Sequence, residues 1–231
     1  MKQLYFLCLF MVAMFASSCD DSTKPDTPDN TVNTTTDTTA KTIDPQDAPE
    51  IVEETNITMT KIEQVTLPFS LDFDPDKDGE IIDIHQIEDG SGFSYIVRAF
   101  NTANDKHNMS VMYYKLAEGE GAQIGKFEKS IDNCEFDLMN EHKTDGMQVS
   151  DLDGDGLAEF TCMFTLDCTS DVSPLATHLV VFENDQVYSL SGNDKVEGEG
   201  GDFKADENME TEEAFLNQSK SLWEKYAFRD L

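Results

Sequence analysis

An acidic loop kinked by two glycines lies between two strand-like runs, and it constrains the fold more than any other feature of the chain. The loop reads Asp151-Leu-Asp-Gly-Asp-Gly-Leu-Ala-Glu159. Residues 147–152 before it and 159–167 after it alternate apolar and polar side chains, which is the period of a half-buried β-strand. A cysteine and an SDVSP turn follow directly. This arrangement predicts a β-rich domain built around an oxygen-lined loop.

Period-two alternation recurs along most of the chain. The runs that read as strands are residues 62–69, 80–87, 93–100, 109–116, 123–131, 134–138, 147–152, 159–167, 177–182 and 186–190. Short turn sequences such as Asn184-Asp185 join several of them, which favours an antiparallel meander over βαβ units. No internal repeat of propeller type is present. We expect a mainly β fold, an antiparallel meander or partial propeller-like sheet, with one C-terminal α-helix.

The C-terminal region has a different pattern. Residues 194–208 are acidic and glycine-rich and predict an exposed loop. Beyond them Thr211 can act as an N-cap, and Phe215, Leu222, Trp223 and Tyr226 fall on one helical stripe. We expect a closing helix that docks on the sheet, with the tryptophan serving in packing.

The acidic loop contains the residue types of a cation site. Asp151, Asp153 and Asp155 alternate, so a tightly curled loop directs all three carboxylates inward. The carbonyl of Leu157 adds a neutral oxygen, and Glu159 closes the set. Hard oxygen ligands in this number select Ca²⁺. The alternative is an acidic hairpin turn that binds no metal.

The flanks of the loop distinguish it from an EF-hand. An EF-hand has a bidentate Glu at its twelfth position, where this chain has Cys162. The loop instead resembles the short calcium-binding β-hairpin loops of FG-GAP and VCBS-type repeats. A second alternating run, Asp74-Pro-Asp76-Lys-Asp78, has Ile82 at its ninth position. We expect a turn there, and the pattern leaves a weak second cation site open.

The N-terminus reads as an export leader. After Lys2, residues 4–15 are almost wholly apolar, a run shorter than the roughly 20 residues that a membrane-spanning helix needs. Small residues and Cys19 follow, which resembles a bacterial lipobox. We expect residues 1–18 to be a lipoprotein signal peptide and Cys19 to be lipidated; the alternative is an ordinary signal peptide. Residues 19–57, rich in Thr, Asp and Pro, predict a disordered tether, and residues 58–231 a single β-rich domain.

The charge limits the partners. The formal net charge is −31, so the chain repels nucleic acid and anionic lipid head groups. We therefore expect no nucleic-acid partner and contact with the membrane only through the lipid anchor.

The cysteines suggest one disulfide. Cys8 leaves with the leader and Cys19 takes lipid, so three cysteines remain in a setting that permits disulfides. Cys162 alternates with core residues of a strand, whereas Cys168 lies at a strand end beside a turn. We favour pairing of Cys134 with Cys168, and the spacing leaves Cys134 with Cys162 open.

Catalytic motifs are missing from the sequence. It contains no nucleophile elbow, no H-E-x-x-H and no phosphate-binding glycine loop. None of its four histidines has the spacing of a metal or triad motif. With 47 Asp and Glu residues, a pair of carboxylates is no sign of an active site. The sequence predicts no catalytic residue.

Three segments together resemble one known family. They are residues 133–138 (NCEFDL), 150–159 (the acidic loop) and 168–174 (CTSDVSP). On these the chain resembles a family of small Bacteroidetes lipoproteins labelled surface-polysaccharide biosynthesis proteins, and the likeness covers the second half of the chain. The resemblance implies a role near the cell envelope and supports Cys134 and Cys168 as the paired cysteines. It supplies no catalytic residue.

The function expected from sequence follows from these features. We expect an outer-membrane lipoprotein, facing the cell surface or the periplasm, that acts as a non-catalytic binding or assembly factor linked to surface polysaccharide. Its partners would be surface glycans or envelope proteins. Two alternatives remain: a glycan-active enzyme that uses paired Asp and Glu, and a structural or adhesion module.

Overall fold

The fold was taken from a computed structural model of the chain. It describes residues 56–63, 72–103 and 105–230, all of which belong to one compact unit spanning Val52–Leu231. The expected signal peptide, Cys19 and nearly all of the expected tether lie outside the described residues. Within the described part, no helix has the length and apolar character that crossing a membrane requires.

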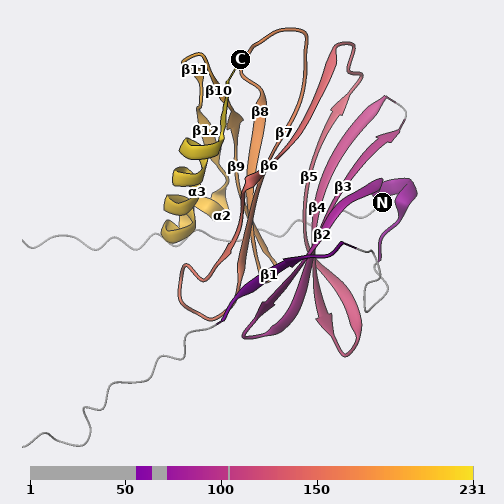
Figure 1. Ribbon diagram of the computed structural model, residues 1–231, viewed down its shortest axis with the longest axis vertical. Coiled ribbons are helices and arrows are strands. Elements are labelled where there is room, and N and C mark those ends of the chain that lie inside the picture. Colours follow the sequence, from indigo (N-terminus) through magenta and orange to yellow (C-terminus); the bar gives the residue numbers. More distant parts are fainter. Residues whose placement is uncertain (1–55, 64–71, 104, 231) are drawn as a thin grey trace, which may run out of the picture. The chain divides into compact units, whose positions relative to one another are not determined.

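Two five-stranded antiparallel sheets form most of the unit (Figure 1). Sheet A is a meander in the order β1-β2-β3-β4-β5. Its strands are β1 Thr58–Lys61, β2 Glu80–Asp89, β3 Gly92–Ala103, β4 Lys106–Ala117 and β5 Glu120–Asp132. A short helix, α1 Pro75–Asp78, precedes β2.

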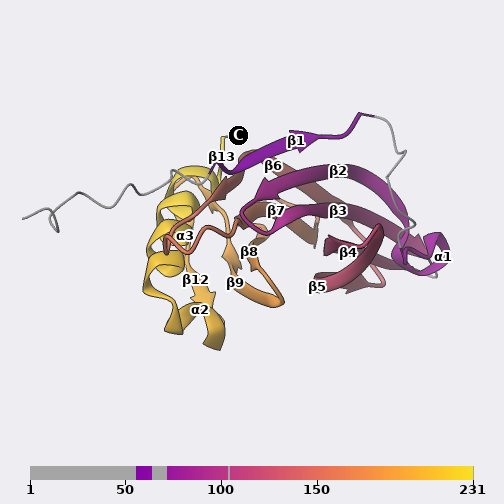
Figure 2. The same cartoon turned by 90° about the horizontal axis from the view of Figure 1, so that it is seen from below.

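Sheet B has the order β12-β9-β8-β7-β6. Its strands are β6 Asp137–Ser150, β7 Glu159–Thr169, β8 Ala176–Glu183, β9 Gln186–Asn193 and β12 Phe203–Ala205. Three very short strands make a third sheet: β10 Lys195–Val196, β11 Glu199–Gly200 and β13 Phe228–Arg229. Helices α2 Glu207–Thr211 and α3 Glu213–Tyr226 lie on the face of sheet B that is turned away from sheet A (Figure 2).

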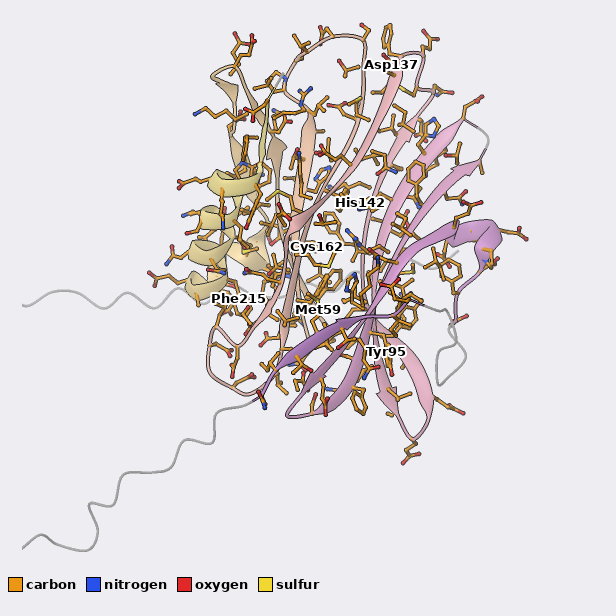
Figure 3. The ribbon with its side chains drawn as sticks, viewed as in Figure 1. Met59, Tyr95, Asp137, His142, Cys162 and Phe215 are labelled. Atoms are coloured by element: carbon orange, nitrogen blue, oxygen red, sulfur yellow. A yellow bond between two sulfur atoms is a disulfide. The ribbon has the colours of Figure 1, made fainter. Side chains whose placement is uncertain are left out.

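The main core lies between the two sheets. Alternate residues of β7, including Phe160, Cys162 and Phe164, pack there against residues of sheet A such as Ile96 and Val111. The intervening residues of β7 point the other way, and Met163 packs in the cluster beneath α3. Figure 3 shows Cys162 between the sheets and Phe215 on the helix side. Because both faces of β7 are covered, its first eight residues, from Glu159 to Leu166, are all buried.

The outer face of sheet A carries a further apolar cluster. Tyr95, Val97 and Tyr114 are buried there, packed against partly buried residues that include Ile62 and Phe73. Sheet A therefore also buries apolar side chains on both faces, although it has no long helix on its outer side in the described residues.

The expected fold class is confirmed: the unit is mainly β, with antiparallel sheets and a C-terminal helix. The stripe of Phe215, Leu222 and Trp223 is buried as expected. The expected helix is α3, but its N-cap position is Glu212 rather than Thr211. Thr211 instead ends the separate short helix α2, which Asp206 caps by accepting from Met209 N (2.7 Å).

Two expectations about local structure were wrong. Residues 134–136 are not a strand and Phe136 is 62% exposed, whereas β6 runs without a break from Asp137 to Ser150 and shifts register between Lys143 and Gln148. Residues 194–208 are not simply an exposed loop. Asp194 is fully buried, where it accepts hydrogen bonds from Leu175 N (2.6 Å) and Arg229 Nε (2.9 Å).

A disulfide joins Cys134 to Cys168. This is the pair that the family resemblance implied. Cys162 is free and buried in the main core, and burial raises the pKa of its thiol to about 12. At neutral pH it stays protonated and behaves as a small apolar side chain.

Candidate metal centre

The acidic loop connects the end of β6 at Ser150 to the start of β7 at Glu159. Its own side chains hold its curl: Asp153 accepts from Asp155 N (3.1 Å), and Asp155 accepts from Leu157 N (2.8 Å). Positive φ angles at Gly154 (77°) and Gly156 (85°) reverse the chain, a conformation that glycine adopts without steric cost. The carboxylates are therefore fixed by local hydrogen bonds rather than by distant contacts.

Glu159 is the buried end of the loop. It is 0% exposed, and both of its carboxylate oxygens accept from Leu152 N at 3.0 Å. Burial raises the pKa of this carboxyl above its ordinary value, while the hydrogen bond from Leu152 acts in the opposite direction.

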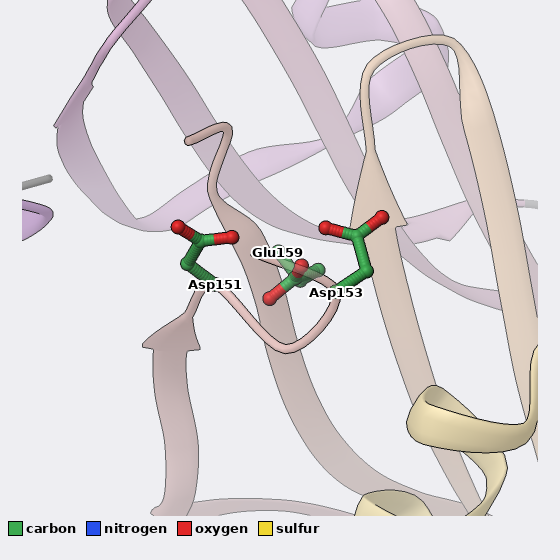
Figure 4. A group of neighbouring side chains, drawn as sticks. All are labelled: Asp151, Asp153 and Glu159. Carbon is green, nitrogen blue, oxygen red and sulfur yellow. The ribbon is translucent and has the colours of Figure 1, made fainter. Parts of the chain in front are cut away.

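Three of the expected ligands come together. Oxygens of Asp151, Asp153 and Glu159 lie within 4.8 Å of one another, and Figure 4 shows the two aspartates on either side of Glu159. Asp155 is not in this group but belongs to a second one with Asp153. Leu157, expected to offer its carbonyl, is half-buried in the loop and donates its amide to Asp155.

Sequence reasoning missed Glu183, the last residue of β8. Its carboxylate lies within 4.8 Å of those of Asp153 and Asp155, and the residue is only 8% exposed. Burial raises its pKa to about 7, and the neighbouring carboxylates, Asp153 first among them, push it in the same direction. The sequence does place an acid directly before the Asn184-Asp185 turn. Only the β7–β8 register, with Phe160 opposite Phe182, brings that acid beside the loop.

The loop also contacts sheet A. Gly90 N, in the β2–β3 turn, donates to Gly156 O (3.1 Å), and Ala158 N donates to Asp89 Oδ2 (3.1 Å). The approach is close, because a Cβ at Gly90 would lie 2.9 Å from Gly156 O. The acidic loop of sheet B is therefore joined directly to a hairpin of sheet A.

The charge balance of this centre favours a cation. Among the ion pairs of the described residues, none involves Asp153, Asp155, Glu159 or Glu183. Like charges at this spacing repel each other strongly where water is partly excluded. An all-oxygen set of carboxylates suits a hard divalent cation such as Ca²⁺ far better than a soft transition metal.

The second acidic run folds differently. Asp74 caps the short helix α1 by accepting from Asp76 N (3.1 Å), and it pairs with Lys77 (2.7 Å). Asp78 pairs with Lys126 on β5 (3.2 Å). Neither metal-sized acidic group found in the described residues includes this run.

Two of the histidines, His142 and His178, are largely removed from solvent. His142 lies between the sheets, where its Nδ1 is 3.1 Å from Arg98 Nη1, and Arg98 pairs with Asp83. Burial and then the Arg98 charge lower the pKa of His142 to about 4. His178 is likewise buried, and its pKa also falls to about 4, chiefly through burial. With these pKa values both rings are neutral at pH 7, and His142 also borders a pocket with Tyr226 and Phe228.

Comparison of the chain with protein-family models, curated proteins and solved structures finds no match. The functional argument therefore depends on the residues themselves.

Proposed function

We infer that this protein binds Ca²⁺ at the acidic loop, and that the cation stabilises the junction between the two sheets. The observation that carries this inference is two groups of close carboxylates that share Asp153. Four of their members form no ion pair in the described residues: Asp153, Asp155, Glu159 and Glu183. Two of these carboxylates are buried. Removing a buried charge from water costs several kcal/mol unless an opposite charge is supplied, and a divalent cation supplies it.

Thermal unfolding with and without Ca²⁺ tests the inference. We expect Ca²⁺ to raise the unfolding midpoint relative to chelator, because a ligand that binds only the folded state stabilises it by mass action. Asp153→Asn, which removes the carboxylate shared by both groups, should abolish most of this rise. Asp132→Asn removes an exposed carboxylate at the end of β5 and is the matched control. A midpoint that chelator leaves unchanged in the native chain contradicts the inference.

The wider role we propose is that of a membrane-anchored envelope lipoprotein. Its support is the leader and Cys19 in the sequence, together with the disulfide, which suits an oxidising compartment outside the cytoplasm. Metabolic labelling with radioactive palmitate tests it. Label should enter the native chain and be lost from Cys19→Ser; label that persists in this variant argues against the lipid site.

Within the envelope we propose a non-catalytic binding or assembly role linked to surface polysaccharide. Its support is the resemblance of residues 133–138, 150–159 and 168–174 to the family of small lipoproteins labelled surface-polysaccharide biosynthesis proteins. A glycan array probed with the purified chain, with and without Ca²⁺, tests this role. Absence of binding to any glycan under both conditions contradicts it.

One observation favours the enzymatic alternative. Burial raises the pKa of Glu183 to about 7, and its carboxylate lies within 4.8 Å of that of Asp153. A carboxyl with a raised pKa beside a second carboxylate is the usual general acid of a glycosidase. Ca²⁺ bound there would occupy both groups. If the native chain hydrolyses a polysaccharide and Glu183→Gln abolishes that hydrolysis, the protein is an enzyme. Glu183 would then act in catalysis rather than in a structural cation site.

A further inference from the structure

A polar pocket on the outer face of sheet A is unlike the rest of this acidic molecule. It has a volume of about 390 Å³. Its floor comes from β3, β4 and β5, and its wall from α1. Three lysines line it, Lys77, Lys106 and Lys126, in a chain with only 16 basic residues against 47 acidic ones. This pocket therefore concentrates basic side chains on a chain that is strongly acidic overall.

The wall of the pocket is fixed to its floor. Asn101 Nδ2 on β3 donates to Lys77 O (2.8 Å), and Lys126 on β5 pairs with Asp78 of α1 (3.2 Å). Gly79 ends α1 with a φ of 92°, and a Cβ there would lie 2.4 Å from Phe100 O. The helix and the sheet thus meet at a contact that only glycine permits, so the pocket is held by three separate constraints.

Only some of the lysines that line the pocket are already in ion pairs. Lys126 engages both Asp78 and Glu128 (2.8 Å), and Lys77 pairs with Asp74 outside the pocket lining. Lys106 is exposed and forms no ion pair among the described residues. One ammonium group therefore remains available to a ligand anion.

The floor also offers hydrogen-bonding groups. Asn101 and Asn108 are directly opposite each other on β3 and β4. Asn108 is 8% exposed; its Nδ2 donates to Ser110 Oγ (3.4 Å), and its Oδ1 has no partner in the structure. This Oδ1 is closed to solvent, so the hydroxyl contacts of a ligand fall to the other polar groups of the lining.

The lining excludes other ligand classes. It contains no aromatic side chain, so it has no surface on which a nucleobase or another flat ring could stack. Asp78 and Glu128 offset two of the three lysines and leave the lining with a net charge of +1, which matches a singly charged carboxylate better than a doubly charged phosphate. The same two carboxylates can accept hydrogen bonds from ligand hydroxyls.

We propose that this pocket binds a singly charged, hydroxyl-rich carboxylate, of which a uronic acid residue is the simplest example. The ligand carboxylate pairs with Lys106, and ligand hydroxyls donate to the carboxylates of Asp78 and Glu128. The proposal rests on the binding role proposed above, for which it names the ligand class and the site.

Titration of the purified full chain with glucuronate, followed by ¹H–¹⁵N NMR, tests the site. We expect the side-chain amides of Asn101 and Asn108 to shift and to give a saturable binding curve. Lys106→Gln should weaken binding at least about tenfold, which corresponds to 1.4 kcal/mol. Asn108→Asp should also weaken it, because it adds a carboxylate to the floor. Lys220→Gln, an exposed lysine of α3, should bind as the native chain does, and melting curves confirm that each variant folds.

Three further probes identify the chemistry. Glucose lacks the carboxylate, propionate lacks the hydroxyls, and inorganic phosphate carries more charge; each should bind at least about tenfold more weakly than glucuronate, a difference of about 1.4 kcal/mol. Equal binding of any of them, absence of glucuronate binding, or shifts confined to residues outside the pocket overturns the proposal.

A glycan array run on the same preparation distinguishes a failure of this site from a failure of the proposed binding role. Binding to neutral polysaccharide that Lys106→Gln leaves intact preserves the binding role and overturns this site. Absence of all glycan binding overturns both.

Discussion

Single carboxylates determine the chemistry of this protein. Glu159 and Glu183 are acids buried on adjacent strands of a sheet that already carries the acidic loop. Packing alone does not explain why these two acids are buried. Burial disfavours the charged form of each carboxyl and so raises the pKa of both. Their placement is explained if they complete a cation site, because the attraction of each carboxylate to a bound cation offsets the repulsion between the carboxylates.

Replacing Glu183 with Gln should have opposite effects in chelator and in Ca²⁺. In chelator at pH 8 we expect the variant to be more stable than the native chain by about 1 kcal/mol, because a buried like charge is removed. In Ca²⁺ it should gain less stability than the native chain, because a ligand is lost. Urea unfolding under both conditions measures the two effects. A variant that is less stable in chelator would indicate that Glu183 serves only in packing.

His142 should make the fold sensitive to mild acid. Burial and Arg98 lower its pKa from 6.5 to about 4, while Asp83 and Glu141 act in the opposite direction. The unfolded chain therefore binds the proton more readily than the folded one between these two values. The stability that this ring contributes is complete above pH 6.5 and is lost as pH falls toward 4. NMR titration of the ring checks the pKa, and a midpoint near 6.5 would contradict the buried, neutral assignment.

At the scale of elements, the junction between the loop and the β2–β3 turn joins two sheets that also meet through the apolar core and the contact of Arg98 with His142. Asp89 and Gly90 supply both hydrogen bonds across it. In an isolated hairpin, this turn would have no such contact to make. A change in the acidic loop on cation binding would therefore reach sheet A directly.

Asp89→Ala should weaken this junction by about 1–3 kcal/mol, the range for leaving a buried donor, here Ala158 N, without its acceptor. We expect the variant also to lose part of the Ca²⁺-dependent stabilisation, because the loop is less well fixed. Calorimetry of native and variant chains, each with and without Ca²⁺, measures the coupling. Glu88→Ala, at an exposed neighbouring position of β2, is the control; equal losses in the two variants would remove the special role of Asp89.

At the scale of the whole molecule, three layers are closed by covalent and ionic contacts at their ends. The disulfide joins the segment before β6 to β7. Arg229 joins the C-terminal strand β13 to the buried Asp194 and also donates to Ser173 O (2.7 Å). These contacts stabilise the two packed sheets at the ends of their strands.

Loss of the disulfide should lower stability by about 3–4 kcal/mol, the loop-entropy estimate for a bridge that spans 34 positions. The double variant Cys134→Ser with Cys168→Ser, unfolded in urea beside the native chain, measures this. Cys162→Ala should leave the bridge intact and cost less, since only a small buried side chain is removed. A greater loss in Cys162→Ala than in the double variant would contradict this account.

The sequence by itself determined the local structure. Period-two alternation placed most strands of both sheets, the amphipathic stripe placed α3, and the spacing of Asp151, Asp153 and Glu159 selected residues that the fold brings together. These features follow from neighbours along the chain, where side-chain direction repeats with a known period.

Only the tertiary structure decided what distant segments do together. Strand register brings Glu183 beside the acidic loop, and the packing of the two sheets brings Asp89 to the same loop. The buried Asp194 pairs with Arg229, which is 35 positions away. Alternation fixes which face a residue takes but not which strand lies beside it. That choice depends on packing of the whole core, so these residues cannot be paired from the sequence alone.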